Sequence, residues 1–271
     1  MNMESFAVIA ALVKARSGIV LTPDKGYMLE TRLAPILRTE GFSDLDALAL
    51  RLRAPRTESL ARAVTEALTT NESSFFRDGK PFDHLRRLMP KLMAARPPGH
   101  RPRIWSAACS TGQEAFSAAM VLAELGIRHA EILGTDLSRE VVERARDGSF
   151  TQFEVQRGLP VQMMVKYFRQ EGGKWRVLPE LRAMTRFEER NLLGEHRALG
   201  CFDVIFCRNV LIYFDPPTKG RVLNAMAAQL APDGVLYLGG AETVLGLTDR
   251  LEAVPGERGV YALAARRALA G

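Results

Sequence analysis

The stretch Arg103–Ser117 places the narrowest limits on the fold, because it passes from a strand pattern to a helix pattern through a turn of small residues. Its first part, Ile104–Ala108, is a short apolar run consistent with a buried strand. After Gly112, apolar side chains recur at helical spacing. A strand, a small-residue turn and a helix in this order predict the opening of a doubly wound α/β sheet, in which ligands bind beyond the carboxyl ends of the strands.

An acidic residue follows the second predicted strand. That strand is expected at Glu131–Thr135, and it ends at Asp136, 24 residues after Gly112. In nucleotide-binding α/β folds an acid about 20 residues past the glycine turn holds a ribose hydroxyl. The spacing therefore indicates a ligand that contains a nucleoside.

The turn itself argues against a dinucleotide, which would need the pattern Gly-x-Gly-x-x-Gly. Gly112 is the only glycine between Arg103 and Ser117, and Glu114 opens the helix. A carboxylate at a helix N-terminus would repel a phosphate and attract a cation. S-adenosylmethionine fits, because it is a nucleoside with a sulfonium and an ammonium group and no phosphate. An ordinary α/β turn with a surface glutamate is the alternative.

Composition excludes several other classes. The 271 residues are 47% hydrophobic, which suits one large domain and a small one. No apolar run approaches the roughly 20 residues of a transmembrane helix, and no secretory signal begins the chain. Cys109, Cys201 and Cys207 form no Cys-x-x-Cys pair, and the four histidines are scattered, so neither a metal site nor a Ser/His triad is indicated. We expect a cytoplasmic protein without a metal.

The net charge of +6 is concentrated in one segment. Residues 71–102 contain seven Lys and Arg against three acids, whereas residues 1–70 are nearly balanced. No aromatic residues suited to base stacking lie among these charges. A solvated basic helix is the simplest interpretation, and an acidic protein partner explains the charge as well as nucleic acid does.

The N-terminal part of the chain is predicted to be helical. Amphipathic stripes indicate four helices within residues 1–70, the first around Phe6–Val13. We expect Thr22–Pro23 to cap the second, Ser43 the third and Thr57 the fourth. These helices predict a separate domain of residues 1–70, followed by a linker and helix at 71–102 and an α/β domain at 103–271.

The α/β domain contains a less regular insertion at about residues 150–186, where Gly172–Gly173 indicates a hairpin turn. Polar residues follow two further strands. Asn191-Leu192 comes after a strand at 187–190, and Arg208-Asn209 comes after the strongly apolar strand 202–207.

The segment Asn71–Asp78 joins the two predicted domains. Asn71, Ser73 and Arg77 offer hydrogen-bonding groups at a domain junction, where ligand sites often form. Arg77 could hold a carboxylate through two hydrogen bonds, such as that of a methionine moiety. The alternative is a helix cap with Phe75 and Phe76 in the core.

Four segments together resemble the CheR family of chemotaxis receptor methyltransferases, which esterify receptor glutamates with S-adenosylmethionine. They are Thr70–Asp78 (TNESSFFRD), Trp105–Glu114 (WSAACSTGQE), Gly134–Asp136 (GTD) and Phe202–Phe214 (FDVIFCRNVLIYF). The resemblance covers nearly the whole chain in order. It implies a Rossmann-like methyltransferase domain, a small all-helical N-terminal domain that recognises the receptor and a small β subdomain insertion.

The resemblance also implies the site, the products and the partner. Asp136 would hold the ribose of the cofactor, and Glu114 its cationic methionine end. The cofactor contacts that it implies are Asn71, Ser73, Arg77, Glu114, Asp136, Asn191, Leu192, Arg208 and Asn209. The products would be glutamyl methyl esters and S-adenosylhomocysteine. The partner would be the cytoplasmic helical bundle of chemotaxis receptors, bound by a monomer without nucleic acid or membrane insertion.

The chain departs from the family pattern in two places. Ala115-Phe116 stands where the family often has Pro-Tyr, which puts a tyrosine contact in doubt. The loop Gln170–Lys174 is shorter than that of family members that bind a pentapeptide at the receptor's C-terminus. We therefore expect docking that does not depend on such a pentapeptide.

Methyl transfer to a carboxylate is an in-line displacement on an activated sulfonium, so it needs alignment and removal of water more than a general base. Tyr213, just past the Arg208-Asn209 strand end, is the candidate that positions the target carboxylate. A half-buried tyrosine that only packs is equally consistent with the pattern.

Two other classes of function were weighed. Asp215–Thr218 (DPPT) resembles the Asp-Pro-Pro-Tyr loop of nucleic-acid amino-methylating enzymes. It lies eight residues beyond Cys207 and lacks the aromatic residue that stacks on a flipped base, which argues against that class. A cofactor-binding adaptor without enzymatic activity is the second alternative.

Overall fold

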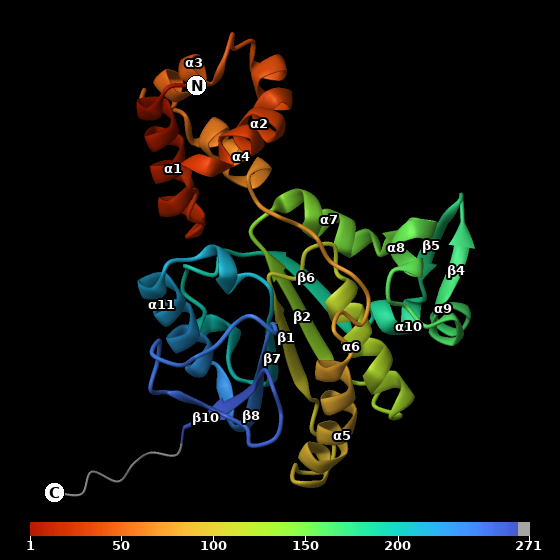
Figure 1. Ribbon diagram of the computed structural model, residues 1–271. Coiled ribbons are helices and arrows are strands. Elements are labelled where there is room, and N and C mark those ends of the chain that lie inside the picture. The colour runs from red at the N-terminus through yellow and green to blue at the C-terminus, as the bar shows by residue number, and fades with distance from the viewer. Residues whose placement is uncertain (265–271) are drawn as a thin grey trace, which may run out of the picture. The chain divides into compact units, whose positions relative to one another are not determined.

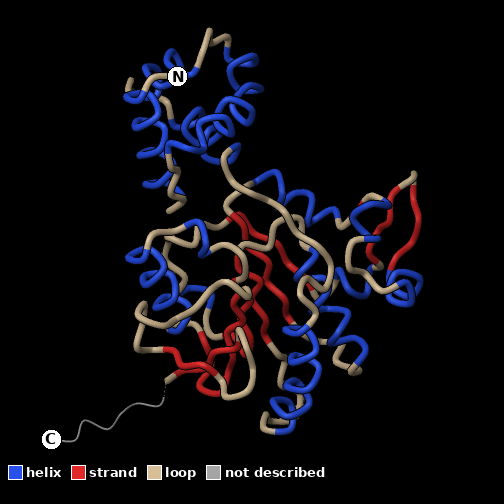
Figure 2. The backbone as a smooth tube through the Cα atoms, viewed as in Figure 1, coloured by secondary structure: helices blue, strands red, loops and turns tan. Residues whose placement is uncertain are grey.

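The computed structural model describes residues 1–264, and the chain divides into two compact units (Figures 1 and 2). Unit 1 comprises residues 1–70 together with the segment 213–218. Unit 2 comprises residues 71–212 and, within the described part of the chain, residues 219–264. The chain therefore leaves unit 2 once, at residue 213, and returns to it six residues later.

Unit 1 is built of four short helices and one 3₁₀ turn (Figure 1). They are α1 (Met3–Ser17), η1 (Pro23–Lys25), α2 (Gly26–Glu40), α3 (Leu45–Leu52) and α4 (Glu58–Ala67). Apolar side chains at helical spacing form one core, in which the fully buried members are Ile9, Val13, Leu29, Leu33, Leu48 and Val64. The four predicted helices are confirmed.

Two predicted helix starts are wrong. Asp44, not Ser43, caps α3, because its carboxylate accepts a hydrogen bond from the Ala47 backbone N–H at 2.8 Å. Thr22–Pro23 opens the 3₁₀ turn η1, and α2 itself begins only at Gly26. Both errors arise because several neighbouring residues can serve as caps, and the local backbone conformation decides which of them does so.

The segment 213–218 packs with the helices of unit 1. Ile19 and Phe214 form an antiparallel bridge, and the Val20 N–H donates to the Tyr213 carbonyl at 2.9 Å. Lys14 pairs with Asp215 at 2.7 Å, and this hydrogen bond lowers the pKa of the Asp215 carboxyl. The prediction that these residues belong to the α/β domain is not what the structure shows, because no local sequence pattern indicates the bridge between Ile19 and Phe214.

Unit 2 contains a seven-stranded sheet in the order β6-β2-β1-β7-β8-β10-β9. In chain order the strands are β1 (Arg103–Ala107), β2 (Glu131–Asp136), β6 (Thr185–Glu189), β7 (Phe202–Cys207), β8 (Leu230–Leu238), β9 (Leu251–Ala253) and β10 (Val260–Leu263). The first five strands of the sheet run parallel, and β10 is antiparallel to both of its neighbours. Strand order reverses between β1 and β7, which is where doubly wound sheets bind ligands.

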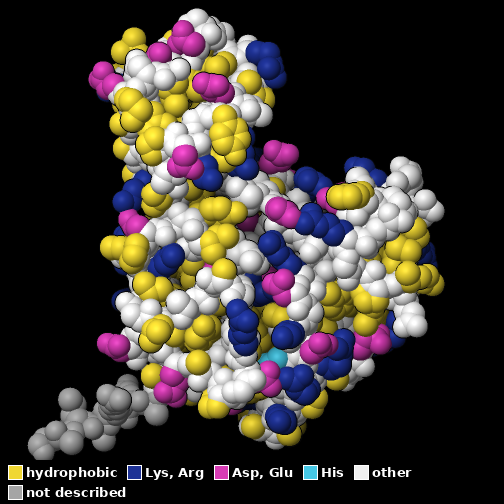
Figure 3. Space-filling view, in the orientation of Figure 1, with side chains coloured by type: hydrophobic (Ala, Val, Ile, Leu, Met, Phe, Trp, Pro, Cys, Tyr) yellow, Lys and Arg dark blue, Asp and Glu magenta, His cyan; other side chains and the backbone are white. Residues whose placement is uncertain are grey.

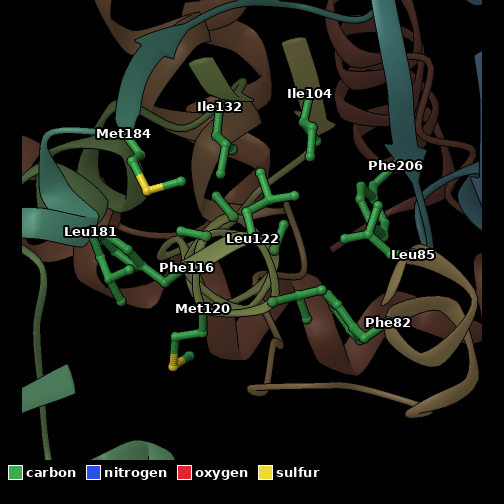
Figure 4. Close-up of a cluster of buried hydrophobic side chains, with 14 of the residues drawn as sticks. Phe82, Leu85, Ile104, Phe116, Met120, Leu122, Ile132, Leu181, Met184 and Phe206 are labelled. Carbon is green, nitrogen blue, oxygen red and sulfur yellow. The ribbon is translucent and has the colours of Figure 1, made fainter. Parts of the chain in front are cut away.

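Helix α5 leads into the first strand of this sheet, and the other helices and 3₁₀ turns that accompany the sheet lie between its strands in sequence. They are α5 (Lys80–Ala94), α6 (Gln113–Glu124), α7 (Arg139–Asp147), η2 (Arg197–Leu199), η3 (Leu211–Tyr213) and α11 (Pro216–Ala227). Helix α6 is buried along most of its length, and its Phe116 and Leu122 belong to the same hydrophobic core as Phe82 and Leu85 of α5. In this core Phe116 lies beside Leu181, and Phe82 lies beside Phe206 of β7 (Figure 4). Within residues 1–264, no helix is both long and apolar enough to cross a bilayer.

A second, small antiparallel sheet has the order β3-β5-β4 (Figure 1). Its strands are β3 (Ser149–Phe150), β4 (Phe168–Glu171) and β5 (Lys174–Val177), and its helices are α8 (Gln152–Gln156), α9 (Val161–Tyr167) and α10 (Pro179–Arg182). Gly172 and Gly173, both at positive φ, form a two-residue turn between β4 and β5, so the predicted hairpin is confirmed. The main-sheet strand β6 begins at Thr185, two residues inside the range expected for this insertion.

Candidate active site

The carboxyl ends of four parallel strands meet at one edge of the large sheet. Ala107 of β1 pairs with Thr135 of β2 and with Cys207 of β7, and Asp136 of β2 pairs with Glu189 of β6. The residues that follow these strands are therefore neighbours, although up to about a hundred residues separate them in sequence. This edge contains most of the side chains that the sequence analysis selected.

The turn between β1 and α6 has an unusual backbone. Ala108, Ser110 and Gly112 have φ angles of 61°, 50° and 95°. A Cβ at position 112 would lie 3.1 Å from Ala145 Cβ and 3.2 Å from the Phe187 ring, so both the angle and the space require glycine there. No side chain caps the N-terminus of α6, which leaves its first N–H groups available at the sheet edge.

Asp136 is buried, and backbone groups on two sides hold its carboxylate. Oδ2 accepts the Ser110 N–H at 2.8 Å, and Oδ1 accepts the Ser138 N–H at 3.1 Å. The side chain is thus fixed in orientation at this edge of the sheet.

Glu114 is a buried carboxylate beside a buried arginine. Ser106 Oγ donates to Oε1 at 2.7 Å, and Arg208 Nη1 donates to Oε2 at 3.1 Å. The side chains of Glu114 and Arg208 are 13% and 2% exposed. Burial raises the pKa of Glu114, and the positive charge of Arg208 and the Ser106 hydroxyl oppose that rise. The interpretation of Glu114 as a surface residue is therefore wrong.

Arg208 also connects the end of β7 to the junction segment 71–78. Its Nη2 donates to the Arg77 carbonyl at 2.8 Å and to Asp78 Oδ2 at 2.6 Å. Its Nε is buried and has no hydrogen-bond partner. One guanidinium therefore holds both Glu114 and the junction, and Nε remains free to donate to a further group at this edge.

The junction segment 71–78 is tied to the turn after β1 and to α6. Ser110 Oγ donates to the Asn71 carbonyl at 2.7 Å, and Ser117 Oγ accepts the Phe76 N–H at 3.0 Å. These bonds hold the backbone of the segment at the same edge as Asp136 and Glu114. Phe75 is buried, as the packing interpretation requires, while Ser73 and Arg77 are half-buried and Asn71 is exposed.

Asn191 and Leu192 follow β6 at this edge. Asn191 Oδ1 accepts the Leu193 N–H at 3.0 Å, and the Leu192 carbonyl lies 3.1 Å from His196 Nε2. Both residues are thus held in a defined turn.

The nine predicted cofactor-binding residues all lie in unit 2, either at the ends of its strands, at the start of α6 or in the junction segment. Tyr213 lies in unit 1, where it is half-buried and its carbonyl bonds to Val20. Its role in positioning a substrate stays a prediction.

Several residues of the site were not predicted from the sequence. Ser106 and Ser110 contact Glu114, Asp136 and the junction, and Asp78 pairs with Arg208. Glu242, after β8, accepts hydrogen bonds from the loop after β7. Two sequence signals could have identified Ser106 and Glu242. Ser106 is a polar residue inside a buried strand, and Glu242 is an acid shortly after one. Among residues 1–264, no group of three or more His, Cys, Asp or Glu side chains could hold a metal ion together.

A mostly parallel doubly wound sheet with an acid at the end of β2 and another at the start of α6, and without a phosphate-binding glycine loop, fits an S-adenosylmethionine-binding methyltransferase domain, and the sequence matches that class. Residues 71–260 match the family described as CheR methyltransferase, SAM binding domain, and residues 4–69 match CheR methyltransferase, all-alpha domain. The chain belongs to the CheR methyltransferase family.

Curated relatives are similar over nearly the full length. The chain is 36% identical to chemotaxis protein methyltransferase Cher2 of Pseudomonas putida over 268 residues, covering 96% of each chain. It is 37% identical to chemotaxis protein methyltransferase 1 of Pseudomonas aeruginosa, covering 94% of this chain and 96% of the relative. It is 38% identical to chemotaxis protein methyltransferase 1 of Vibrio cholerae, with coverages of 89% and 90%.

Proposed function

We propose that this enzyme transfers the methyl group of S-adenosylmethionine to glutamate side chains in the cytoplasmic helical bundle of chemotaxis receptors. The products are glutamyl methyl esters and S-adenosylhomocysteine. The observation that carries the proposal is the pair of buried acids, Glu114 and Asp136, at one edge of a sheet in a chain of the CheR family. The names of the relatives support a chemotaxis substrate.

The residues at the sheet edge fit this cofactor. Asp136, held by two backbone N–H groups at the end of β2, is assigned to the ribose hydroxyls. Glu114 offers negative charge to the sulfonium and ammonium end, and Arg208 Nε offers a buried donor without a partner. The other contacts are assigned to the remaining predicted residues: Asn71, Ser73, Arg77, Asn191, Leu192 and Asn209.

When bound, the cofactor supplies a methyl group that is already activated by its positive sulfur. A substrate glutamate is ionised at neutral pH, so no residue of this chain has to remove a proton. The protein's contribution is alignment of the carboxylate with the methyl group and exclusion of water around it. We assign the alignment to Tyr213, whose hydroxyl can donate to a carboxylate oxygen.

The receptor is assigned to the helices of residues 1–70 and to the basic face of α5. Arg86 and Arg87 of α5 are exposed. Arg86 forms an ion pair with Asp83, and Arg87 forms one with Glu257. On the face drawn in Figure 3, Lys and Arg side chains lie among Asp and Glu side chains rather than in a field of one sign. Exposed arginines such as Arg86 and Arg87 therefore act mainly on the rate of encounter with an acidic partner.

Docking without a receptor pentapeptide is supported by the hairpin of the small sheet. Strands β4 and β5 are joined by only two residues, Gly172 and Gly173, so the turn offers no long loop to enclose a peptide.

The test uses S-adenosylmethionine with a labelled methyl group, incubated with the protein and chemoreceptor membranes. Receptor label that mild base releases as methanol is the expected result, because carboxyl esters hydrolyse in base. Membranes without receptor provide the control. Cofactor binding with no base-labile label on receptor would contradict the proposal and favour the adaptor alternative. Base-resistant label on nucleic acid would favour the amino-methylating class.

A further inference from the structure

Glu242 is a buried acid, 9% exposed, four residues past the end of β8. Its carboxylate accepts four backbone hydrogen bonds. Oε2 accepts the N–H groups of Gly239 at 2.6 Å and Asn209 at 2.9 Å. Oε1 accepts those of Val210 at 3.0 Å and Leu211 at 2.7 Å. The loop after β7 and the loop after β8 are therefore joined through one side chain.

Position 239 is occupied by a glycine, which lets the Glu242 carboxylate come close to the backbone. Strands β7 and β8 end side by side, with Cys207 opposite Leu238. A Cβ added to Gly239 would lie 2.7 Å from Glu242 Oε2 and 2.9 Å from Asn209 Nδ2. Any other residue would push the carboxylate or the Asn209 side chain away, so glycine is required by space.

The hydrogen bonds from residues 209–211 to Glu242 stabilise a backbone conformation that is unfavourable by itself. Asn209 has φ 59°, in the left-handed region, which costs a non-glycine residue free energy. The next residues lead into the 3₁₀ turn η3 (Leu211–Tyr213), whose first N–H groups have no partner within the turn. The Glu242 carboxylate satisfies three successive N–H groups there, as an anion does in a nest of backbone amides.

Glu242 also belongs to the electrostatic surroundings of the candidate site. After the larger effect of burial, the charge of Glu242 is among the causes that raise the pKa of Glu114. It likewise raises the pKa of Cys207, again after burial. Glu242 therefore acts on two groups at the carboxyl ends of the strands.

We infer that Glu242 is a positioning residue for methyl transfer: it holds the backbone of residues 209–211 so that Asn209 stays at the cofactor site. This inference rests on the proposed function only for the identity of the reaction. The hydrogen bonds and the expected loss of cofactor affinity are independent of which substrate accepts the methyl group.

The first measurement is amide hydrogen exchange in Glu242→Gln. The amide of glutamine turns an N–H₂ group toward N–H donors, so the protons of residues 209–211 should exchange about tenfold or more faster. Strands β7 and β8 should keep their protection. The matched control is Glu252→Gln, an exposed acid on β9, which should leave both unchanged. Faster exchange throughout β7 and β8 would mean that Glu242 contributes only to the general stability of the fold, and it would overturn the inference.

The second measurement compares three proteins by calorimetric titration with S-adenosylhomocysteine and by turnover. Glu242→Gln should weaken cofactor binding by about tenfold, while KM for receptor changes by less than about threefold. Glu242→Asp keeps the carboxylate but is shorter, whereas Glu242→Gln keeps the shape. A positioning role through the carboxylate requires the Asp variant to bind better than the Gln variant, and a packing role requires the opposite order.

The outcomes separate this inference from the proposed function. If the wild-type protein binds S-adenosylhomocysteine but methylates no receptor, the proposed function fails and the order of affinities still decides the role of Glu242. Wild-type affinity in Glu242→Gln, with or without faster exchange at residues 209–211, would overturn the positioning role. If Glu242→Gln does not fold, the Asp variant decides alone: faster exchange at residues 209–211 together with wild-type affinity for S-adenosylhomocysteine would overturn the inference.

Discussion

Asp136 and Glu114 are the two acids on which cofactor binding is proposed to depend, and their surroundings differ. Asp136 accepts hydrogen bonds from the backbone N–H groups of Ser110 and Ser138. Glu114 is held by the side chains of Arg208 and Ser106 in a site whose burial raises its pKa. The two carboxylates are therefore tested by different experiments.

Replacing Asp136 with asparagine should weaken binding of S-adenosylhomocysteine by about tenfold to a hundredfold, since hydrogen bonds to a charged acceptor are lost or reversed. Calorimetric titration measures the effect. Asp249→Asn, at an exposed position of unit 2, is the matched control and should bind like the wild type. Equal affinity of the two variants would remove Asp136 from the site.

Affinity for S-adenosylmethionine should fall as pH is lowered below neutral, with a midpoint above the ordinary pKa of glutamate. The reason is that Glu114 must be ionised to hold a cation, and burial raises its pKa. The sign is opposite for the stability of the free protein: the raised pKa favours the folded protein below the ordinary value, and this contribution is lost as pH rises through the raised value. Added cofactor should therefore raise Tm more at neutral pH than at pH about 5.

Glu114→Gln provides the control for that pH profile. It should bind S-adenosylmethionine more weakly at neutral pH and lose the dependence between pH about 5 and 8. An unchanged pH profile in this variant would assign the dependence to another group.

Replacing Tyr213 with phenylalanine should lower kcat on receptor by about tenfold if the hydroxyl positions the target carboxylate. Binding of S-adenosylhomocysteine should not change, because the predicted cofactor contacts all lie in unit 2. Full turnover in this variant would leave Tyr213 a packing residue of unit 1.

Helix α5 is the element on which surface charge is proposed to matter. The double variant Arg86→Glu and Arg87→Glu should slow methylation of receptor by about tenfold at low salt and less at high salt, because charge acts on the rate of encounter. Cofactor affinity should stay the same. Arg128→Glu with Arg186→Glu changes the net charge equally and also breaks ion pairs, so it is the matched control. Equal slowing by both pairs would mean that only net charge matters.

The β4–β5 hairpin is the element on which the pentapeptide prediction depends. A receptor that lacks its last five residues should be methylated as fast as the full-length receptor, because the two-residue turn provides no long binding loop. The check compares initial rates on the two receptors, together with calorimetric titration of the free pentapeptide. Tight binding of the pentapeptide, or much slower methylation of the shortened receptor, would contradict the prediction.

At the scale of the whole chain, the path of residues 213–218 is the least expected feature. Phe214 and Asp215 contact Ile19 and Lys14 of unit 1, although strands of unit 2 come before and after them in sequence. Helix α11 therefore starts in a segment that packs with one unit and continues into the other.

The sequence by itself determined the order and type of most elements. Local periodicity sets helices and strands, and a parallel sheet then brings their carboxyl ends together, so Asp136 and Arg208 could be assigned to one edge. Motifs also identified the family, which the comparisons confirm.

Only the tertiary structure decided which groups meet. The pairing of Arg208 with Asp78, the hydrogen bonds from residues 209–211 to Glu242 and the bridge between Ile19 and Phe214 join residues 31 to 195 positions apart. Such contacts depend on the packing of whole elements, and no local pattern encodes them, because many polar side chains could serve each role in an unfolded chain. The same reason explains why Asp44, rather than its neighbour Ser43, caps α3.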